Sequence, residues 1–134
     1  MKLNVILIIA ASMVAAACQD KTSDTSLTSP DGEINVSFSL SQEGIPHYQV
    51  SAYGQAVINS SELGLEAAEA ELAKGFTIKE IHRSSKDEQW EQPWGENKVM
   101  RDNHREMAVE MENAEGVKLT LRFKAFDDGV GYRY

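Results

Sequence analysis

The stretch that decides the fold is Met107–Ala125, MAVEMENAEGVKLTLRFKA, which holds two alternating runs around one turn. Its second half places an apolar side chain at every other position: Val117, Leu119, Leu121, Phe123 and Ala125. Successive side chains of a β-strand point to opposite faces, so this spacing predicts a strand with one buried face. The first half repeats the pattern with Met107, Val109 and Met111, and Ala114-Glu115-Gly116 lies between the halves. The stretch therefore predicts an antiparallel hairpin.

The same alternation occurs nearer the N-terminus. Glu33–Leu40 carries Ile34, Val36, Phe38 and Leu40 on one face and follows a turn, Pro30-Asp31-Gly32. Further turns at Gln42-Glu43-Gly44 and Tyr53-Gly54-Gln55 lead into apolar runs within Ile45–Tyr53 and Ala56–Ile58. Three short strands joined by tight turns predict a β-meander.

The middle and the end of the chain have less regular patterns. Glu66–Lys74 (EAAEAELAK) has high helix propensity and precedes Gly75, so we expect at most a short helix or a crossover loop there. Phe76 begins another strand that runs to about Arg83, and the polar stretch Ser84–Asn97, with two tryptophans, is predicted to be a long loop.

After the hairpin, Asp127-Asp128-Gly129 turns the chain into a last aromatic run that ends at Tyr134. We therefore expect an all-β fold, an antiparallel β-sandwich with at most one short helix. A terminal strand without a neighbour leaves its backbone groups unpaired, so we expect this sandwich to be incomplete at its C-terminus.

Residues 1–17 have the pattern of a signal peptide. Lys2 is followed by an apolar run that is too short to span a membrane comfortably, and the small residues Val14-Ala15-Ala16-Ala17 lead to Cys18. Bacterial lipoproteins carry their acylated cysteine at this point, so we expect a lipid on Cys18 that anchors the chain to a membrane of the bacterial cell envelope. Ala15 replaces the commonest leucine of such a motif, so cleavage without lipidation and release to the periplasm stays open.

Composition limits the other possibilities. Residues 18–29 are polar and predict a flexible tether, which leaves 30–134 as a single folded unit. The chain has 134 residues and is too short for a barrel enzyme of typical size. Its formal net charge of −8 offers no basic patch for a phosphate backbone, which argues against nucleic acid as a partner.

Five pieces of sequence carry a resemblance to a known family. In chain order they are Ser29-Pro30-Asp31-Gly32, Ser61-Glu62-Leu63-Gly64-Leu65, Lys74-Gly75-Phe76, Trp90 with Pro93-Trp94-Gly95-Glu96, and Phe126-Asp127-Asp128-Gly129-Val130 with Tyr132-Arg133-Tyr134. From about Thr28 to Tyr134 the chain resembles the N-terminal domain of glycoside hydrolase family 97.

That resemblance implies a function for the parent protein. Members of the family are secreted or membrane-anchored bacterial α-glucosidases and α-galactosidases with an N-terminal β-super-sandwich, a catalytic (β/α)8 barrel and a C-terminal all-β domain. Their catalytic carboxylates and most ligands of a calcium ion lie on the barrel. The resemblance therefore implies no catalytic residue and no cofactor in this chain, with calcium in the full-length enzyme. Its implied partners are the catalytic and C-terminal domains and α-linked glycosides, and its implied role is to scaffold the barrel and contribute to the sugar pocket.

Trp90, Trp94 and Glu96 are the candidate sugar-binding residues. An indole face stacks on the C–H groups of a pyranose, and a carboxylate accepts hydrogen bonds from sugar hydroxyls. The alternative is that both indoles anchor the loop on the sandwich.

Other polar residues have simpler explanations. Asp127 and Asp128 precede a glycine and are expected to form a turn rather than a catalytic pair. His47, His82 and His104 lack the short spacings of metal ligands, and Asp102 does not complete a set, so we expect solvated or packing histidines. Arg101 and Arg105 are expected either to pair with loop acids or to meet the barrel.

Two other functions stay open at this stage. One is a stand-alone, lipid-anchored β-sandwich that binds glycan or assists another protein. The other is a purely structural surface lipoprotein.

Overall fold

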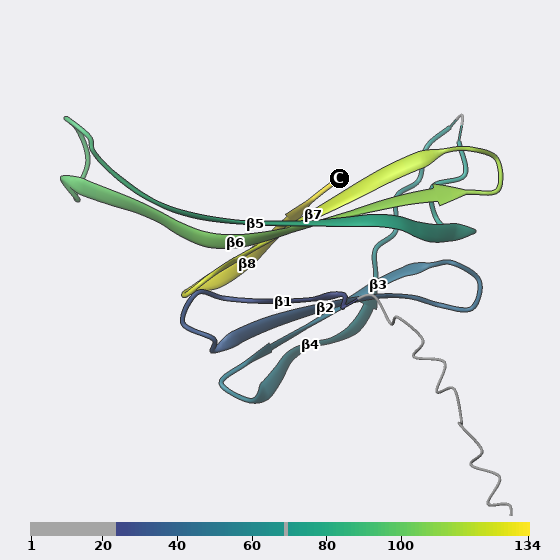
Figure 1. The fold of residues 1–134 in the computed structure, drawn as a ribbon, viewed down its shortest axis with the longest axis horizontal. Helices are drawn as coiled ribbons and strands as arrows, with labels where there is room; N and C mark the ends of the chain where they lie inside the picture. Colours follow the sequence, from purple (N-terminus) through teal and green to yellow (C-terminus); the bar gives the residue numbers. More distant parts are fainter. Residues whose placement is uncertain (1–23, 69) are drawn as a thin grey trace, which may run out of the picture.

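The structure, a computed structural model, describes residues 24–68 and 70–134 and contains two four-stranded antiparallel sheets stacked in two layers (Figure 1). The first sheet has the order β1 (Ser26–Thr28), β2 (Ile34–Leu40), β3 (Pro46–Ala52) and β4 (Gln55–Glu62). The second has the order β5 (Phe76–Glu91), β6 (Val99–Asn113), β7 (Lys118–Phe126) and β8 (Gly129–Arg133). The all-β sandwich is confirmed, and the described residues contain no helix.

The core lies between the two sheets and is filled by the alternating faces predicted from the sequence. Phe38 of β2 and Phe123 of β7 face each other across the layers, with ring centroids 5.9 Å apart. Both rings are almost completely buried. Around them lie the other large buried side chains of the core, from both sheets and from Leu63 just after β4: Leu27, Ile34, Val36, Val50, Leu63, Phe76, Met107, Val109, Met111, Leu119 and Leu121. The one-sided apolar pattern of each strand therefore has its partner in the opposite sheet.

The predicted meander and hairpin are also confirmed. Strands β2, β3 and β4 are neighbours in chain order, as are β6, β7 and β8. Ala52 pairs with Gln55 around a two-residue turn in which both Tyr53 and Gly54 have positive φ angles, 52° and 73°. Two positive φ angles are typical of the type I′ turn, whose twist matches that of the strands it joins.

Strand β1 lies in the range predicted as tether, so the sandwich begins earlier than expected. Leu27 pairs with Val36 and is 3% exposed, because this single large apolar residue of the polar stretch enters the core. Arg83 of β5 fixes the strand from the other sheet. Its guanidinium donates to the carbonyl oxygens of Ser26 at 2.6 Å and Asp24 at 2.7 Å.

The prediction of a long loop over Ser84–Asn97 is wrong. Most of that stretch belongs to β5, which pairs with β6 in register from Phe76↔Asn113 to Glu91↔Val99. Only Gln92–Lys98 forms a connection without strand structure. The outer part of this hairpin has no sheet neighbour and no core below it, so its sequence lacks the apolar alternation by which a strand is recognised.

The stretch with helix propensity, Glu66–Lys74, is part of the link between the two sheets. Its described residues contain no helix, in agreement with the crossover-loop alternative. Leu65 and Leu72 pack against the core, and Asn113 donates its side-chain amide to the carbonyl of Glu71 at 3.1 Å. Nine residues are too few for an autonomous helix, so these tertiary contacts decide the conformation.

Candidate functional site

The most distinctive surface feature is a two-stranded arm, residues 86–104, that extends beyond the sandwich (Figure 1). Strand β6 pairs with β7 only from His104 inward, where His104 lies opposite Phe126. Beyond that point β5 and β6 continue as an isolated pair to Glu91↔Val99. An isolated hairpin has little stability of its own, so an arm of this length suits a contact with another surface.

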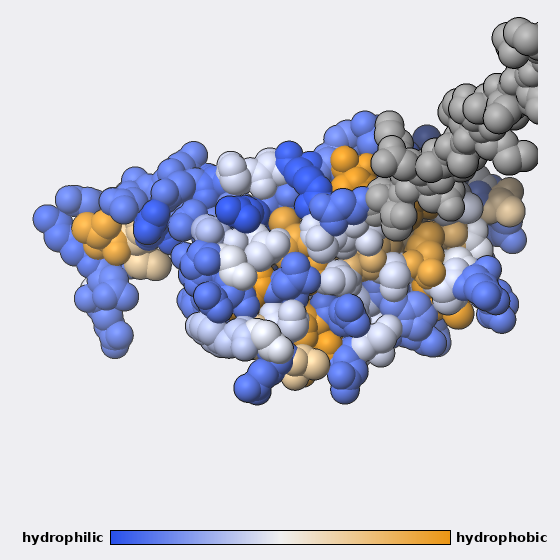
Figure 2. Space-filling view, turned by 60° about the horizontal axis from the view of Figure 1, so that its bottom comes forward, coloured by the Kyte–Doolittle hydropathy of each residue, from blue (hydrophilic) through white to orange (hydrophobic). Residues whose placement is uncertain are grey.

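The tip of the arm exposes apolar groups. Trp90 on β5 is 48% exposed, Trp94 in the connecting loop is 83% exposed, and Val99 on β6 is 53% exposed. Figure 2 shows apolar surface near the far end of the extension, surrounded by hydrophilic residues. Both indoles are thus available to a partner, and the alternative in which they anchor a loop on the sandwich is not what the structure shows.

Glu96 lies in the same loop, and its side chain is exposed. Backbone and side-chain groups of Gln92 hold this loop: its N–H donates to the Lys98 carbonyl at 3.0 Å, and its amide donates to the Asn97 carbonyl at 3.1 Å. Gly95 has a φ of 113°, a backbone conformation that residues with a side chain rarely adopt. The tip therefore has a defined turn that carries Trp94 and Glu96, and Trp90 lies next to it at the end of β5.

Charged side chains brace the base of the arm. Lys86 lies between Glu88 and Asp102, with its ammonium 3.0 Å and 3.1 Å from their carboxylates. Glu88 and Asp102 are directly opposite each other on the two strands, a like-charge pair that Lys86 offsets. Hydrogen bonds to Glu88 and Asp102 raise the pKa of Lys86 above its ordinary value. Lys86 thus adds an ion pair across two strands that the β5–β6 ladder already joins.

His104 is the buried member of this network. It is 4% exposed, and its ring packs on Phe126 with centroids 5.0 Å apart. Its Nδ1 lies 2.5 Å from Oδ1 of Asp102. This hydrogen bond, followed by that of Lys86, holds the pKa of Asp102 below its ordinary value. His104 is therefore the packing histidine that the sequence led us to expect.

The two arginines of the predicted set take different roles. Arg101 forms a two-point contact with Asp87, at 2.8 Å and 2.7 Å, on the other face of the arm. This contact lowers the pKa of the Asp87 carboxyl. Arg105 reaches the carbonyl of Pro30 at 3.5 Å. Arg101 thus pairs with an acid, which is the first of the two alternatives expected for these arginines. Arg105 instead contacts the turn before β2.

Asp127 and Asp128 form the predicted turn between β7 and β8. Asp127 also accepts a hydrogen bond from the backbone N–H of Asp31, at 2.9 Å. Two of the motifs on which the resemblance depends therefore meet in space, one from each sheet. Their role is structural, as expected for a turn.

A histidine and two carboxylates gather on the outer face of the second sheet. Nε2 of His82 lies 3.6 Å from a carboxylate oxygen of Glu80 and 3.4 Å from one of Glu110. His82 is one of the histidines expected to be solvated or packing, and its half-exposed side chain fits the solvated alternative. Glu110 is far away in the sequence, and only the β5–β6 register could have identified this cluster.

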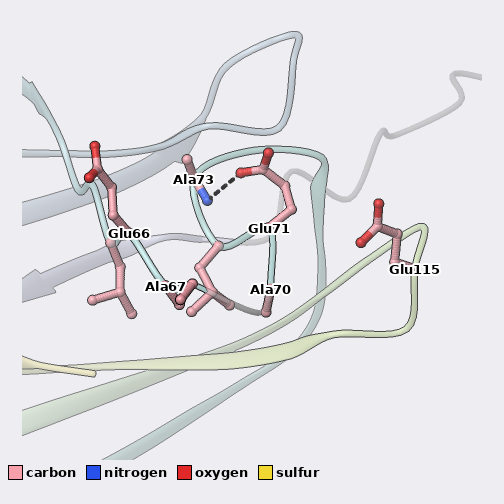
Figure 3. A pocket seen from close by; sticks show the side chains of 9 residues that line it. Glu66, Ala67, Ala70, Glu71, Ala73 and Glu115 are labelled. Carbon is pink, nitrogen blue, oxygen red and sulfur yellow. Dashed lines mark hydrogen bonds between the residues drawn. The ribbon is translucent and has the colours of Figure 1, made fainter.

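A hollow of about 490 Å³ lies beside the link between the sheets (Figure 3). Four alanines and the acidic residues Glu66, Glu71 and Glu115 contribute to its lining. Glu71 accepts a hydrogen bond from the N–H of Ala73 at 3.0 Å, while the Glu66 and Glu115 side chains lie on opposite sides of the loop. The hollow has no aromatic side chain in its lining, so it lacks the stacking surface that sugar recognition uses.

Cys18 and the signal peptide lie outside the described residues, so the structure does not bear on the lipid anchor. Within residues 24–68 and 70–134, no helix is long and apolar enough to cross a membrane.

Comparison with known proteins gives consistent results. The sequence model of a family described as "Glycosyl-hydrolase 97 N-terminal" matches residues 27–134. Similar solved structures include a glycoside hydrolase family 97 enzyme from Pseudoalteromonas sp. strain K8 in complex with acarbose, and a variant of it in complex with panose. Each is 39% identical, with a TM-score of 0.76, over 81% of this chain and 17% of that chain.

A β-arabinopyranosidase is similar in fold, with a TM-score of 0.75 at 22% identity. The chain thus spans about 17% of the length of the solved structures that it matches.

Proposed function

The chain belongs to the glycosyl-hydrolase 97 N-terminal family, and on this premise we propose that it is the non-catalytic front part of a secreted α-glycosidase, an α-glucosidase or α-galactosidase. In that enzyme it scaffolds the catalytic barrel and contributes to the sugar-binding pocket. The proposal rests on the match of the family model over residues 27–134. This chain also covers only 17% of the length of the related enzyme's chain, as expected for one part of a longer enzyme. The stand-alone glycan-binding lipoprotein is not favoured, because the similar solved proteins are glycosidases.

The ligands of the relatives support an α-linked substrate. The Pseudoalteromonas enzyme was solved in complexes with panose and with acarbose. Panose is a trisaccharide of α-linked glucose units. A glucoside is therefore the first substrate class to assay, with a galactoside as the alternative.

An exposed aromatic group supports the scaffold role. Tyr132 on β8 packs at a tilt against Tyr48 of the first sheet and edge-to-face against Tyr134, with ring centroids 5.3 Å and 6.1 Å apart. Tyr132 and Tyr134 remain 44% and 45% exposed. Large aromatic groups exposed together are typical of interaction surfaces. We assign this surface to contacts with the polypeptide that follows in the parent enzyme.

The arm is the part of this chain best suited to contribute to a sugar pocket. Its tip offers two exposed indoles and the carboxylate of Glu96, the groups that recognise a pyranose ring. We propose that Trp90, Trp94 and Glu96 form part of the pocket wall in the assembled enzyme.

Calcium is proposed for the full-length enzyme and not for this chain. Calcium takes six to eight oxygen ligands. Among the described residues, the group of side chains close enough to hold a metal ion, Glu80, His82 and Glu110, includes an imidazole nitrogen and does not fit that preference. We place most of the calcium ligands of the parent enzyme on its barrel, as the resemblance implies.

A lipid on Cys18 would place the enzyme at a membrane of the bacterial cell envelope. Metabolic labelling with a radioactive fatty acid tests this, with C18A as the control. Incorporation into wild type alone is the expected result, and unlabelled wild-type protein would contradict lipidation.

The experiment that tests the proposed function is to express the complete reading frame and to assay it on α-glucosides and α-galactosides, with the 134-residue chain as the matched control. We expect the complete protein to hydrolyse one of the two and the shorter chain to hydrolyse neither. Hydrolysis by the shorter chain, or a complete protein that acts on neither class, would contradict the proposal.

A further inference from the structure

The cluster of Glu80, His82 and Glu110 is held by the pairing of two long strands. Glu80 and His82 lie two residues apart on β5, so their side chains point to the same face. In the β5–β6 register Glu80 is directly opposite Glu110, and His82 is opposite Ala108. A register shift between Ile78 and Glu80 precedes the cluster and sets this alignment. One ligand atom from each of the three residues lies within 4.8 Å of the others.

The distances differ from those of ordinary hydrogen bonds. Nε2 of His82 is 3.6 Å from Glu80 and 3.4 Å from Glu110, whereas N–H···O bonds are typically about 2.7–3.2 Å long. Ligand bonds to Zn²⁺ are about 2.0–2.2 Å, which puts neighbouring ligands of a tetrahedral site about 3.4 Å apart. The distance from the imidazole nitrogen to each carboxylate is thus close to the distance between two neighbouring ligands of a zinc ion.

The strand pairing also brings two negative charges together, which favours a bound cation at this point. Glu80 and Glu110 are paired across the two strands, where like charges are destabilising. Opposite His82 the partner strand carries only the small side chain of Ala108, which offers no competing polar group. A divalent ion bound by all three side chains would offset the repulsion and would link the edge strand β5 to β6 near the base of the arm.

We propose that Glu80, His82 and Glu110 form a surface site for a divalent transition-metal ion of the Zn²⁺ type, with the remaining positions taken by water. One imidazole nitrogen and two carboxylate oxygens are ligands that zinc accepts, and the nitrogen disfavours Ca²⁺ and Mg²⁺. The proposal does not depend on the glycosidase function.

The test is to titrate the full chain with ZnCl₂ alone and to measure the heat of binding by isothermal titration calorimetry. A C18S background removes the thiol, which would bind zinc itself. We expect saturable binding of one ion. H82A and the nearly isosteric E110Q each remove a direct ligand and should weaken zinc binding by at least about 10-fold. Loss of a residue that only supports a ligand already lowers metal affinity by about 10- to 100-fold. The matched controls H47A and E115Q change a histidine and a glutamate elsewhere and should bind as the C18S parent does.

NMR of the imidazole nitrogens gives a second measurement that does not depend on a substitution. Zinc should shift the Nε2 resonance of His82 and leave those of His47 and His104 in place. Circular dichroism of each variant identifies any loss of fold, and E110Q keeps the test decisive if H82A unfolds. Absence of saturable binding, unchanged binding in both H82A and E110Q, or an unperturbed His82 resonance at saturation would overturn the proposal.

Discussion

The backbone N–H of Asp31 donates a hydrogen bond to Oδ1 of Asp127 over 2.9 Å and so joins the turn before β2 to the turn before β8. The two turns belong to opposite sheets. Asp31 is itself fixed, because its Oδ1 accepts hydrogen bonds from the hydroxyl of Ser29 at 2.5 Å and the N–H of Glu33 at 3.0 Å. The Ser29 bond, followed by that of Glu33, holds the pKa of Asp31 below its ordinary value. This contact links the two layers at one end of the sandwich.

Substituting Asp127 tests this contact. D127A removes the acceptor of the Asp31 N–H and should lower the free energy of unfolding by about 0.5–1.5 kcal/mol, the net worth of one hydrogen bond. Urea denaturation measures the change. D128A is the matched control, since the side chain of the neighbouring aspartate makes no hydrogen bond among the described residues, and it should stay within about 0.5 kcal/mol of wild type. Equal losses in both variants would show that the turn, and not the hydrogen bond, matters.

Gly44 is required by a close approach between the two sheets. The N–H of Gly75 donates to the Glu43 carbonyl at 2.8 Å, and the N–H of Phe76 donates to the Gly44 carbonyl at 3.1 Å. A Cβ on Gly44 would lie 2.7 Å from the Phe76 carbonyl oxygen and closer still to the Phe76 nitrogen. Backbone atoms cannot move aside as the end of a side chain can, so an alanine here must displace the start of β5.

We therefore expect G44A to destabilise the fold more than a matched glycine substitution does. Gly116 has a similar positive φ, 81° against 71°, but open space around its Cβ position. Both alanine variants share the backbone strain, and the clash should cost G44A about 1–3 kcal/mol more than G116A. Urea midpoints of the two variants measure this difference. Equal midpoints would contradict the role assigned to the close approach.

Acid should weaken the domain through aspartates whose pKa values the fold lowers. Asp102 has its pKa below the ordinary value near 3.8 because of hydrogen bonds from His104 and then Lys86. The folded state then binds fewer protons than the unfolded chain, so the stabilisation is present above this value and is lost as the pH falls through the folded pKa. Urea midpoints should therefore fall below about pH 4. D102N should show a shallower fall than wild type, and D128N should keep the wild-type slope. An identical slope in D102N would contradict the contribution of Asp102.

The sequence predicts the fold best where one face of a strand is buried. The alternation at Met107–Ala125 and Glu33–Leu40 locates the core strands, because burial in a sandwich imposes a period of two. The same physics explains what is missed. The arm has solvent on both faces, so residues 84–91 show no alternation and were predicted as a loop. Strand β1 was missed because Leu27 alone enters the core, which is too little for a pattern.

The two candidate sites also differ in how far the sequence could predict them. Trp90, Trp94 and Glu96 are close in sequence, and all three are exposed near the end of the arm. The Glu80–His82–Glu110 cluster depends on pairing between β5 and β6, including the shift after Ile78. Spacing along the chain cannot reveal such a site, because strand register is set by tertiary packing as well as by turns.

Trp94 distinguishes a sugar-contacting tip from a solvent-exposed one. Its side chain is 83% exposed, so W94A should leave the urea midpoint of the chain unchanged. In the complete enzyme, loss of one stacking contact worth about 0.5–1.5 kcal/mol should raise KM by about 2- to 12-fold. A wall residue that binds substrate and transition state alike changes KM and leaves kcat in place. V57A, an exposed apolar residue on β4, is the control. If W90A, W94A and E96Q all retain the wild-type KM, the arm does not contact the sugar, and its exposed indoles serve to dock it on the rest of the enzyme.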